Sequence, residues 1–187
     1  MSIFFTSDTH FGDSRVLRID KRPFPNLDAH DAALVEAWNA AVGPDDEVWH
    51  LGDFALGPPP ERVRALLAGL NGRKHLIAGN NDGPGTLEAG WDSVAHYAEI
   101  EVEGRGLVLC HYAFRTWNRI GRGTIDLHGH SHGKLKPIPR QYDVGVDAQG
   151  VAPVTLATIL ASRRRRTGRA SADRAGPTPS GAVEPSL

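Results

Sequence analysis

Residues 47–70, EVWHLGDFALGPPPERVRALLAGL, predict one buried strand followed by one helix. The apolar run 48–51 is short and ends in Gly52-Asp53, which is typical of a strand that enters a turn. A helix is predicted over residues 61–70, where apolar side chains recur with helical spacing at Val63, Leu66, Leu67 and Leu70. Pro58 to Pro60 precede this helix and Asn71-Gly72 ends it, so the stretch is one β–α unit.

The same pattern extends to both sides of this unit. Further strands are predicted at residues 3–6, 75–78, 107–110 and 125–127. A helix from Asp28 to Val42 is predicted to begin at Asp28 as its N-cap and to stop at Gly43-Pro44. This alternation indicates an α/β fold, with two mixed β-sheets packed as a sandwich and flanked by helices. After residue 92 no long helix separates the strands, so part of the sheet structure is expected to be antiparallel.

Composition limits the class of protein. With 187 residues, 40% of them hydrophobic and 23% charged, the chain has the make-up of one water-soluble globular domain. No secretory leader and no run of membrane-spanning length is found, so we expect a cytoplasmic protein without a membrane partner. Cys110 is the only cysteine, which excludes an intrachain disulfide and a thiolate zinc site. Any metal would therefore be held by oxygen and nitrogen ligands.

The chain divides by composition into two parts. Residues 1–162 are predicted to form the domain, whereas residues 163–187 are rich in Arg, Pro and Ser and are expected to be a disordered tail. Six Arg of the tail face only Asp173 and Glu184, which leaves 15 basic against 20 acidic side chains on residues 1–162. The charge of the domain therefore gives no reason to expect nucleic acid as its partner.

Metal-competent side chains follow each predicted strand. They are Asp8 and His10, Asp53, Asn80 with Asn81 and Asp82, His111, and His130 with His132. Loops at the carboxyl ends of strands in an α/β sheet converge on one crevice, so these residues can meet. Each fragment alone has a simpler explanation, since Gly52-Asp53 and residues 79–82 are common turns. Their repeated occurrence at strand ends favours a metal site.

The ordered set Asp8-x-His10, Gly52-Asp53, Gly79-Asn80-x-Asp82, His111 and Gly129-His130-x-His132 resembles the calcineurin-like metallophosphoesterase superfamily. The resemblance covers roughly residues 2–160. The stretches SDTHFG, RPF, GPDDEVWHLGDF, LNGRKHLIAGN, LHGHSHG and DVGVD are further similar to a branch of small single-domain phosphoesterases. The resemblance implies a four-layer metallophosphoesterase-like fold.

The resemblance also implies roles for individual residues. Asp8, His10, Asp53 and His132 would hold one divalent metal ion, and Asp53, Asn80, His111 and His130 would hold the other. Manganese is our first expectation, with Fe, Zn, Co or Ni as alternatives. Asp53, Asn81 and Asp82 are the expected catalytic residues of a phosphoester hydrolase, in which the metal ions activate water for attack on phosphorus.

Two positions depart from the family pattern. Asn81 stands where the family usually has the His that protonates the leaving group, and Asp13 stands where the small branch commonly has His. We therefore expect a preference for phosphodiesters or cyclic nucleotides among small phosphate esters. The alternatives are a catalytically weak or silent binding module of the same fold, and a nuclease that uses the basic tail. Nucleic acid is the less favoured partner, and the oligomeric state is left open.

Overall fold

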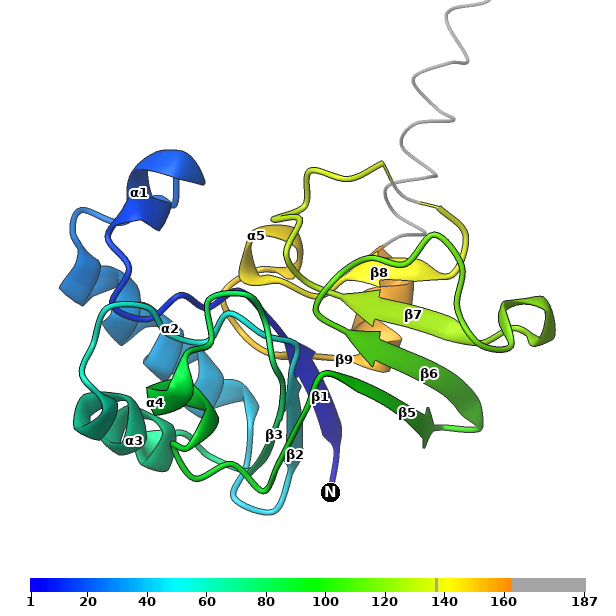
Figure 1. The fold of residues 1–187 in the computed structure, drawn as a ribbon, viewed down its shortest axis with the longest axis horizontal. Coiled ribbons are helices and arrows are strands. Elements are labelled where there is room, and N and C mark those ends of the chain that lie inside the picture. Colours follow the sequence, from blue (N-terminus) through cyan, green and yellow to red (C-terminus); the bar gives the residue numbers. More distant parts are fainter. Residues whose placement is uncertain (137, 163–187) are drawn as a thin grey trace, which may run out of the picture.

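The computed structural model describes residues 1–136 and 138–162, which form two mixed β-sheets with helices (Figure 1). The strands are β1 Ile3–Thr6, β2 Glu47–His50, β3 Arg73–Ile77, β4 Ser93–Ala95, β5 Tyr97–Val102, β6 Arg105–Cys110, β7 Ile125–His128, β8 Gln141–Asp143 and β9 Val154–Thr155. The helices are α1 Arg15–Ile19, α2 Leu27–Ala41, α3 Pro60–Gly69, α4 Pro84–Leu87, α5 Val146–Gln149 and the 3-10 helix η1 Ile120–Arg122. Residues 156–162 are also helical. The predicted tail, residues 163–187, lies outside the described residues.

Both sheets are mixed, and each has one antiparallel strand at its edge. In the first sheet, of order β4-β3-β2-β1-β9, the strands β1 to β4 are parallel and β9 runs antiparallel to β1. In the second, of order β5-β6-β7-β8, only β5 is antiparallel, while β6, β7 and β8 are parallel. The antiparallel portion predicted after residue 92 is therefore limited to β5 and β9.

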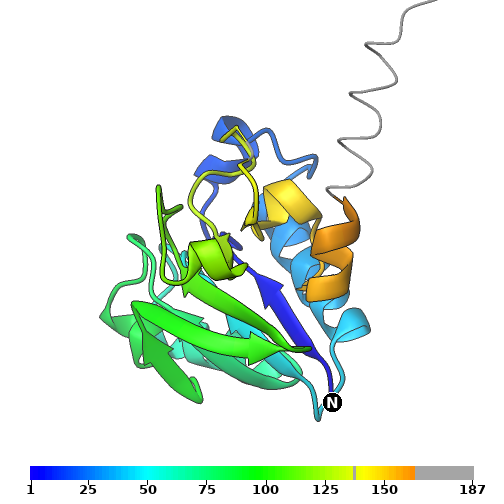
Figure 2. The ribbon, with the colours of Figure 1, turned by 90° about the vertical axis from the view of Figure 1, so that its right-hand side faces the viewer.

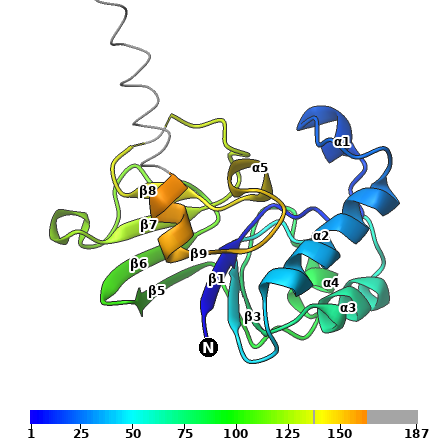
Figure 3. The same cartoon turned by 180° about the vertical axis from the view of Figure 1, so that it is seen from behind.

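Two apolar cores hold these layers together. One lies between the first sheet and the helices α2 and α3, where Trp38, Val48 and Leu67 are buried. The other lies between the sheets, where Phe5 of β1 meets Leu109 of β6 and the helical residues 156–162 add Ile159. Figure 2 shows β1 between the second sheet and α2, and Figure 3 shows α2 and α3 together on the outer side of the first sheet. Burial of each such aliphatic or aromatic side chain contributes about 1.5–3 kcal/mol.

The element boundaries differ from the predicted ones by one or two residues. Helix α2 begins at Leu27, because the side chain of Asn26 accepts a hydrogen bond of 2.8 Å from the backbone N–H of Ala29. Asn26 is thus the N-cap, and the prediction of Asp28 as the cap was wrong. Asp28 lies in the first helical turn instead, where a carboxylate favourably meets the positive end of the helix dipole.

The fold places the functional side chains at one edge of both sheets. Strands β1, β2 and β3 are parallel to one another, as are β6 and β7, so their carboxyl ends point the same way within each sheet. Beyond these ends the sheets are joined by an isolated parallel bridge between Ser7 and Gly145. Among the described residues no helix is long and apolar enough to cross a lipid bilayer.

Candidate metal centre

The first group of side chains consists of Asp8, His10 and His132. One ligand atom from each lies within 4.8 Å of the others. Asp8 and His10 follow β1, whereas His132 follows β7 of the other sheet. Nε2 of His132 is 3.8 Å from Oδ1 of Asp8. Because the members come from both sheets, the group exists only when the sandwich is assembled.

The second group consists of Asp53, His111 and His130, again with ligand atoms within 4.8 Å of one another. These residues follow β2, β6 and β7. The amide oxygen of Asn80, beyond β3, lies 3.1 Å from Nε2 of His111 and adds a further oxygen donor. His130 is exposed while His111 and Asp53 are buried, so this group opens to solvent on one side.

Asp53 lies between the two groups. Its Oδ2 atom is 3.6 Å from Nε2 of His10 in the first group and 3.6 Å from Nε2 of His111 in the second. The structure therefore brings together all seven side chains that were predicted as ligands, with one carboxylate oxygen at the same distance from two histidine nitrogens.

The backbone at the site is strained. Five of the seven predicted ligands have positive φ although they are not glycine: Asp8, His10, Asp53, His130 and His132. Such a left-handed conformation costs on the order of 1–3 kcal/mol per residue and persists only where surrounding contacts enforce it. This conformation occurs just after the strands have ended, where the side chains gather into the two groups.

Glycine permits the close approach of the ligand segments. A Cβ atom on Gly79 would lie 2.3 Å from Oδ1 of Asp53, and one on Gly129 would lie 2.6 Å from Oδ2 of Asp8. Both distances are far shorter than van der Waals contact. Gly79 and Gly129 are therefore needed so that the segments that carry the predicted ligands can approach one another.

The donor chemistry fits divalent cations. Within the described residues, both ring nitrogens of His10 are buried and have no hydrogen-bond partner, which is costly for a polar group unless something binds there. The two groups contribute imidazole nitrogens, carboxylates and one amide, a set that suits first-row transition metals more than Mg²⁺ or Ca²⁺.

A family model supports the same conclusion. Residues 1–141 match the calcineurin-like phosphoesterase superfamily domain. The chain belongs to this superfamily. The Gene 66 protein of Mycobacterium phage L5 is 33% identical over 79% of this chain and 87% of the phage protein. The protein MJ1445 of Methanocaldococcus jannaschii is 30% identical over 84% of this chain and 89% of its own.

Solved structures support the fold. The protein AQ665 from Aquifex aeolicus, described as being of unknown function, superimposes with a TM-score of 0.67 at 20% identity, over 90% of this chain and 98% of that chain. At that level of identity the likeness concerns the arrangement of sheets and helices alone. It agrees with the two-sheet architecture that this calcineurin-like phosphoesterase adopts.

Burial shifts the pKa values of two predicted ligands in this calcineurin-like phosphoesterase. Burial raises the pKa of Asp8 to about 7, although the hydroxyl of Ser7 donates a 2.6 Å hydrogen bond that opposes the shift. Burial lowers the pKa of His10 to about 4, so its imidazole is neutral at pH 7 and its lone pair is available to a cation. A cation beside Asp8 would favour the ionised carboxylate.

In two of the predicted ligand histidines, His132 and His111, the ring nitrogen Nδ1 lies within hydrogen-bond distance of an oxygen atom. Nδ1 of His132 lies 2.7 Å from Oδ2 of Asp147, and Nδ1 of His111 donates to the carbonyl oxygen of Leu51 at 2.8 Å. Nδ1 of His10 makes no hydrogen bond, and Oδ2 of Asp13 lies 3.7 Å from it. The hydrogen bonds of His132 and His111 fix the orientation of these two rings and leave Nε2 for a metal. Asp13, the second departure from the family pattern, thus lies directly behind a predicted ligand.

Asn81 and Asp82 make different contacts with Asp53. The side-chain amide of Asn81 donates to Oδ2 of Asp53 at 2.7 Å, and its backbone N–H donates to Oδ1 at 2.8 Å. Asp82 instead accepts three backbone N–H bonds, from Asp53, Phe54 and Gly79, each of 2.8–2.9 Å. Both Asp82 oxygens are therefore engaged in holding the two ligand segments together.

His50 lies three positions before Asp53, which makes it the nearest histidine to Asp53 in the sequence. It is fully buried, its Nε2 lies 3.0 Å from the hydroxyl of Thr9, and its ring stacks on Trp38. Burial lowers the pKa of His50 to about 3. A solvent-borne substrate has no path to this ring.

Sequence reasoning missed several residues that support the ligands. Asp147 and Arg22 form a bidentate ion pair beside His132, and Asp143 accepts from Ser131 and Gly133 on either side of that histidine. Their only signal was membership in the stretches RPF and DVGVD, which were noted as family-like without a role. Nothing local in either stretch indicates a partner more than a hundred residues away.

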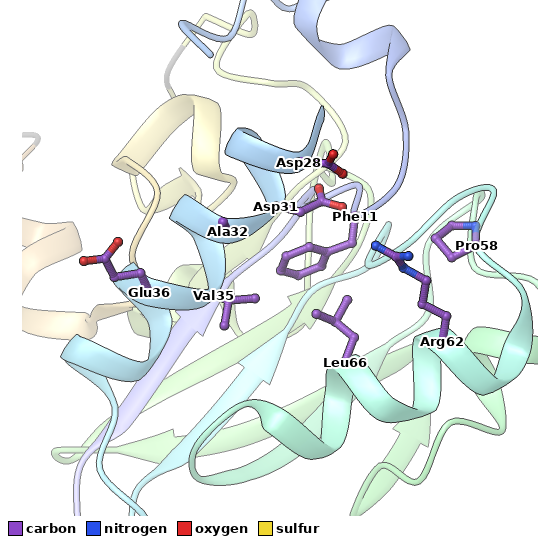
Figure 4. Close-up of a pocket in the computed structure, with 9 residues that line it drawn as sticks. All are labelled: Phe11, Asp28, Asp31, Ala32, Val35, Glu36, Pro58, Arg62 and Leu66. Carbon is purple, nitrogen blue, oxygen red and sulfur yellow. The ribbon is translucent and has the colours of Figure 1, made fainter. Parts of the chain in front are cut away.

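A hollow of about 490 Å³ lies away from the metal centre, between α2 and α3. Figure 4 shows the Phe11 ring pointing between these helices, with an acidic rim on one side. None of the seven predicted ligands lines it. The lining includes Phe11, Val35, Leu66, Asp28, Asp31 and Glu36. The hollow is therefore separate from the predicted ligands.

Proposed function

We propose that this chain is a hydrolase of small phosphate esters that works with two divalent metal ions, manganese being our first expectation. One ion would be held by Asp8, His10, Asp53 and His132, and the other by Asp53, Asn80, His111 and His130. Membership of the calcineurin-like phosphoesterase superfamily supports the reaction class. The two adjacent groups of possible ligands support the use of two ions.

The observation that carries the proposal is the position of Asp53. Its Oδ2 atom is equally far, 3.6 Å, from a histidine nitrogen of each group. A buried carboxylate with this placement is suited to share two cations, because each ion then offsets part of the charge that burial would otherwise penalise. An accidental cluster of polar residues has no reason to converge on one oxygen.

Different residues of the chain would have different roles in the reaction. Bound metal ions supply Lewis acidity, which stabilises negative charge on a phosphoryl group and makes water a stronger nucleophile near pH 7. Asp53 keeps the two groups at a fixed separation, and Asp82 holds the backbone of Asp53 and Gly79 in place. We propose that Asp82 acts through Asp53 and that the exposed side of His130 admits the substrate.

Asn81 sets the proposed substrate preference. Its amide is directed at Oδ2 of Asp53, so the side chain is at the centre of the site. An amide donates hydrogen bonds but does not deliver a proton at neutral pH. Esters whose leaving group departs without protonation, including activated diesters and cyclic nucleotides, would therefore be better substrates than alkyl monoesters.

The test is a substrate screen of chelator-treated protein reloaded with Mn²⁺. The panel comprises nitrophenyl monoesters, nitrophenyl diesters, alkyl monoesters, and 2′,3′- and 3′,5′-cyclic nucleotides. We expect hydrolysis of the nitrophenyl and cyclic substrates, and loss of activity after chelation. Full activity in the chelated protein would rule out metal catalysis, and a protein that binds two ions yet hydrolyses nothing would favour a binding module. Asp53→Ala protein, prepared identically, controls for contaminating phosphatases.

A further inference from the structure

Arg22 is buried beside the metal centre although it ligates nothing there. Its side chain is 4% exposed. It makes five short contacts: Nε with Asp147 Oδ1 (3.0 Å), Nη2 with Asp147 Oδ2 (2.7 Å), Nη2 with the Asp8 carbonyl (2.6 Å), Nη1 with the Thr9 carbonyl (2.9 Å) and Nη1 with His30 Nε2 (2.9 Å). Burying a guanidinium costs several kcal/mol unless its donors are satisfied, and here they are.

Two of these contacts reach the turn that carries Asp8 and His10, and two reach Asp147, which contacts the ring of His132. The carbonyls of Asp8 and Thr9 belong to the turn after β1 that presents Asp8 and His10. Asp147, of α5, meets Nδ1 of His132 at 2.7 Å through the same Oδ2 atom that Arg22 contacts. One guanidinium therefore joins the ligand turn of the first sheet to the ligand turn of the second.

Helix α2 holds the arginine from its other side. Nε2 of His30 accepts from the guanidinium, which leaves the proton on Nδ1 to donate to Oδ1 of Asp31 at 2.8 Å. Oδ2 of Asp31 in turn accepts from the backbone N–H of Gly12 at 3.1 Å, just beyond His10. The position of Arg22 is thus fixed by a chain of hydrogen bonds that begins and ends in the same ligand turn.

We infer that Arg22 is a positioning residue for the first metal group: it holds the strained turn of Asp8 and His10 and, through Asp147, the ring of His132. Asp8, His10 and His132 all have positive φ, so their conformation depends on such contacts. A lysine ammonium, a single compact donor centre, cannot reproduce a fork that reaches two carbonyls and both oxygens of a carboxylate. The inference rests on the proposed metal centre.

The test compares Mn²⁺ binding by calorimetry to chelator-treated wild-type, Arg22→Lys and Asp147→Asn proteins. We expect one of the two sites to weaken by about 10- to 100-fold in each variant, as is common when partners behind metal ligands are lost, while the other site keeps its affinity. The visible spectrum of bound Co²⁺ should change for the weakened site alone, because it reports ligand geometry. Loss of a purely structural contact would lower the melting temperature without this site-selective change.

Two comparisons make the outcome decisive. Arg73→Lys is the matched control, because Arg73 begins β3, is 52% exposed, and its guanidinium contacts Glu47 and the Met1 sulfur, none of them a predicted ligand. This variant should bind Mn²⁺ as the wild type does. In the double variant Arg22→Lys/Asp147→Asn the losses should multiply only in part, since each single variant already disrupts the ion pair between the two residues, while the Arg22 bonds to the carbonyls of Asp8 and Thr9 do not involve Asp147.

Wild-type affinity at both sites in folded Arg22→Lys would overturn the inference. If Arg22→Lys does not fold, the same result in Asp147→Asn would overturn it. A wild-type protein that binds no Mn²⁺ would instead overturn the proposed metal centre itself, so the two failures are distinguishable.

Discussion

Asp53 is the residue on which both halves of the proposed metal centre would depend, because its Oδ2 atom lies 3.6 Å from a histidine nitrogen of each group. In Asp53→Ala the two cations would lose the carboxylate that lies between them and would repel each other. We predict loss of hydrolysis and a fall in bound metal from two ions per chain, with the fold retained. Elemental analysis measures the bound metal, and circular dichroism measures the fold. The control is Asp45→Ala at an exposed position, which should leave the bound metal and the fold unchanged.

Asp53→Asn serves as a second variant, because alanine also leaves the N–H groups of Asn81 without their acceptor. An unsatisfied buried donor costs about 1–3 kcal/mol, which the asparagine would largely avoid. Two ions per chain together with near-normal turnover in Asp53→Ala would contradict the shared-carboxylate model.

The variant Asn81→His tests general acid catalysis at a single side chain. General acid catalysis typically contributes ~10²- to 10⁴-fold in rate, and it matters most when the leaving alkoxide is strongly basic. We predict that Asn81→His raises kcat on alkyl phosphate monoesters by a larger factor than on nitrophenyl esters. The number of bound metal ions should stay the same, because Asn81 is not among the predicted ligands.

The comparison needs kcat for both ester types in both proteins. An equal gain on the two, or a larger gain on the nitrophenyl ester, would mean that another group already supplies the proton or that position 81 lies off the reaction path. His50 is not that group, since it is fully buried behind Thr9.

At the scale of elements, α2 shows how local chemistry determines a boundary. The Asn26 side chain caps the helix, and the helix carries His30 and Asp31, which support Arg22. Asn26→Ala should lower the free energy of unfolding by about 1 kcal/mol, the usual value of an N-cap. Urea denaturation measures the loss. Asp28→Ala should cost less, because a first-turn carboxylate acts only through the helix dipole; a larger loss at Asp28 would identify it as the true cap.

The strand ends were predictable because their signals are local. An apolar run followed by a glycine and a metal-competent residue is readable within a few positions, as at Leu51, Gly52 and Asp53. Strand β5 was not predicted, because it is an edge strand whose exposed side chains, such as Glu99 and Glu101, leave no continuous apolar run. Edge strands of this kind depend on the neighbouring strand more than on their own composition.

The contacts behind the ligands could not be derived in the same way. Arg22 and Asp147 are 125 positions apart, and their pairing follows only once β1 and β7 have been brought to one edge. Asp82 was placed among the catalytic residues by its position in a family block, yet its carboxylate accepts backbone N–H bonds. Sequence spacing identifies a residue type at a strand end, whereas the direction of its side chain is decided by tertiary packing.

At the scale of the whole molecule, five of the nine described non-glycine residues with positive φ are predicted metal ligands. The ring nitrogens of His10 have no hydrogen-bond partner among the described residues, and burial already raises the pKa of Asp8 to about 7. A metal ion that binds the folded chain and not the unfolded one stabilises it by about 2.7 kcal/mol at 100 times its Kd. For a chain of this size each kcal/mol raises the melting temperature by roughly 2–4 °C.

We therefore predict that Mn²⁺ raises the melting temperature of chelator-treated protein by roughly 5–10 °C per occupied site at that excess. Differential scanning calorimetry measures the shift. Mg²⁺ at the same ionic strength should give a much smaller one, because four of the seven predicted ligands are histidines and Mg²⁺ prefers oxygen. Asp53→Ala protein should also respond weakly. Equal shifts of the melting temperature with Mn²⁺ and Mg²⁺ would indicate a general effect of divalent salt. That result would count against a histidine-rich metal centre.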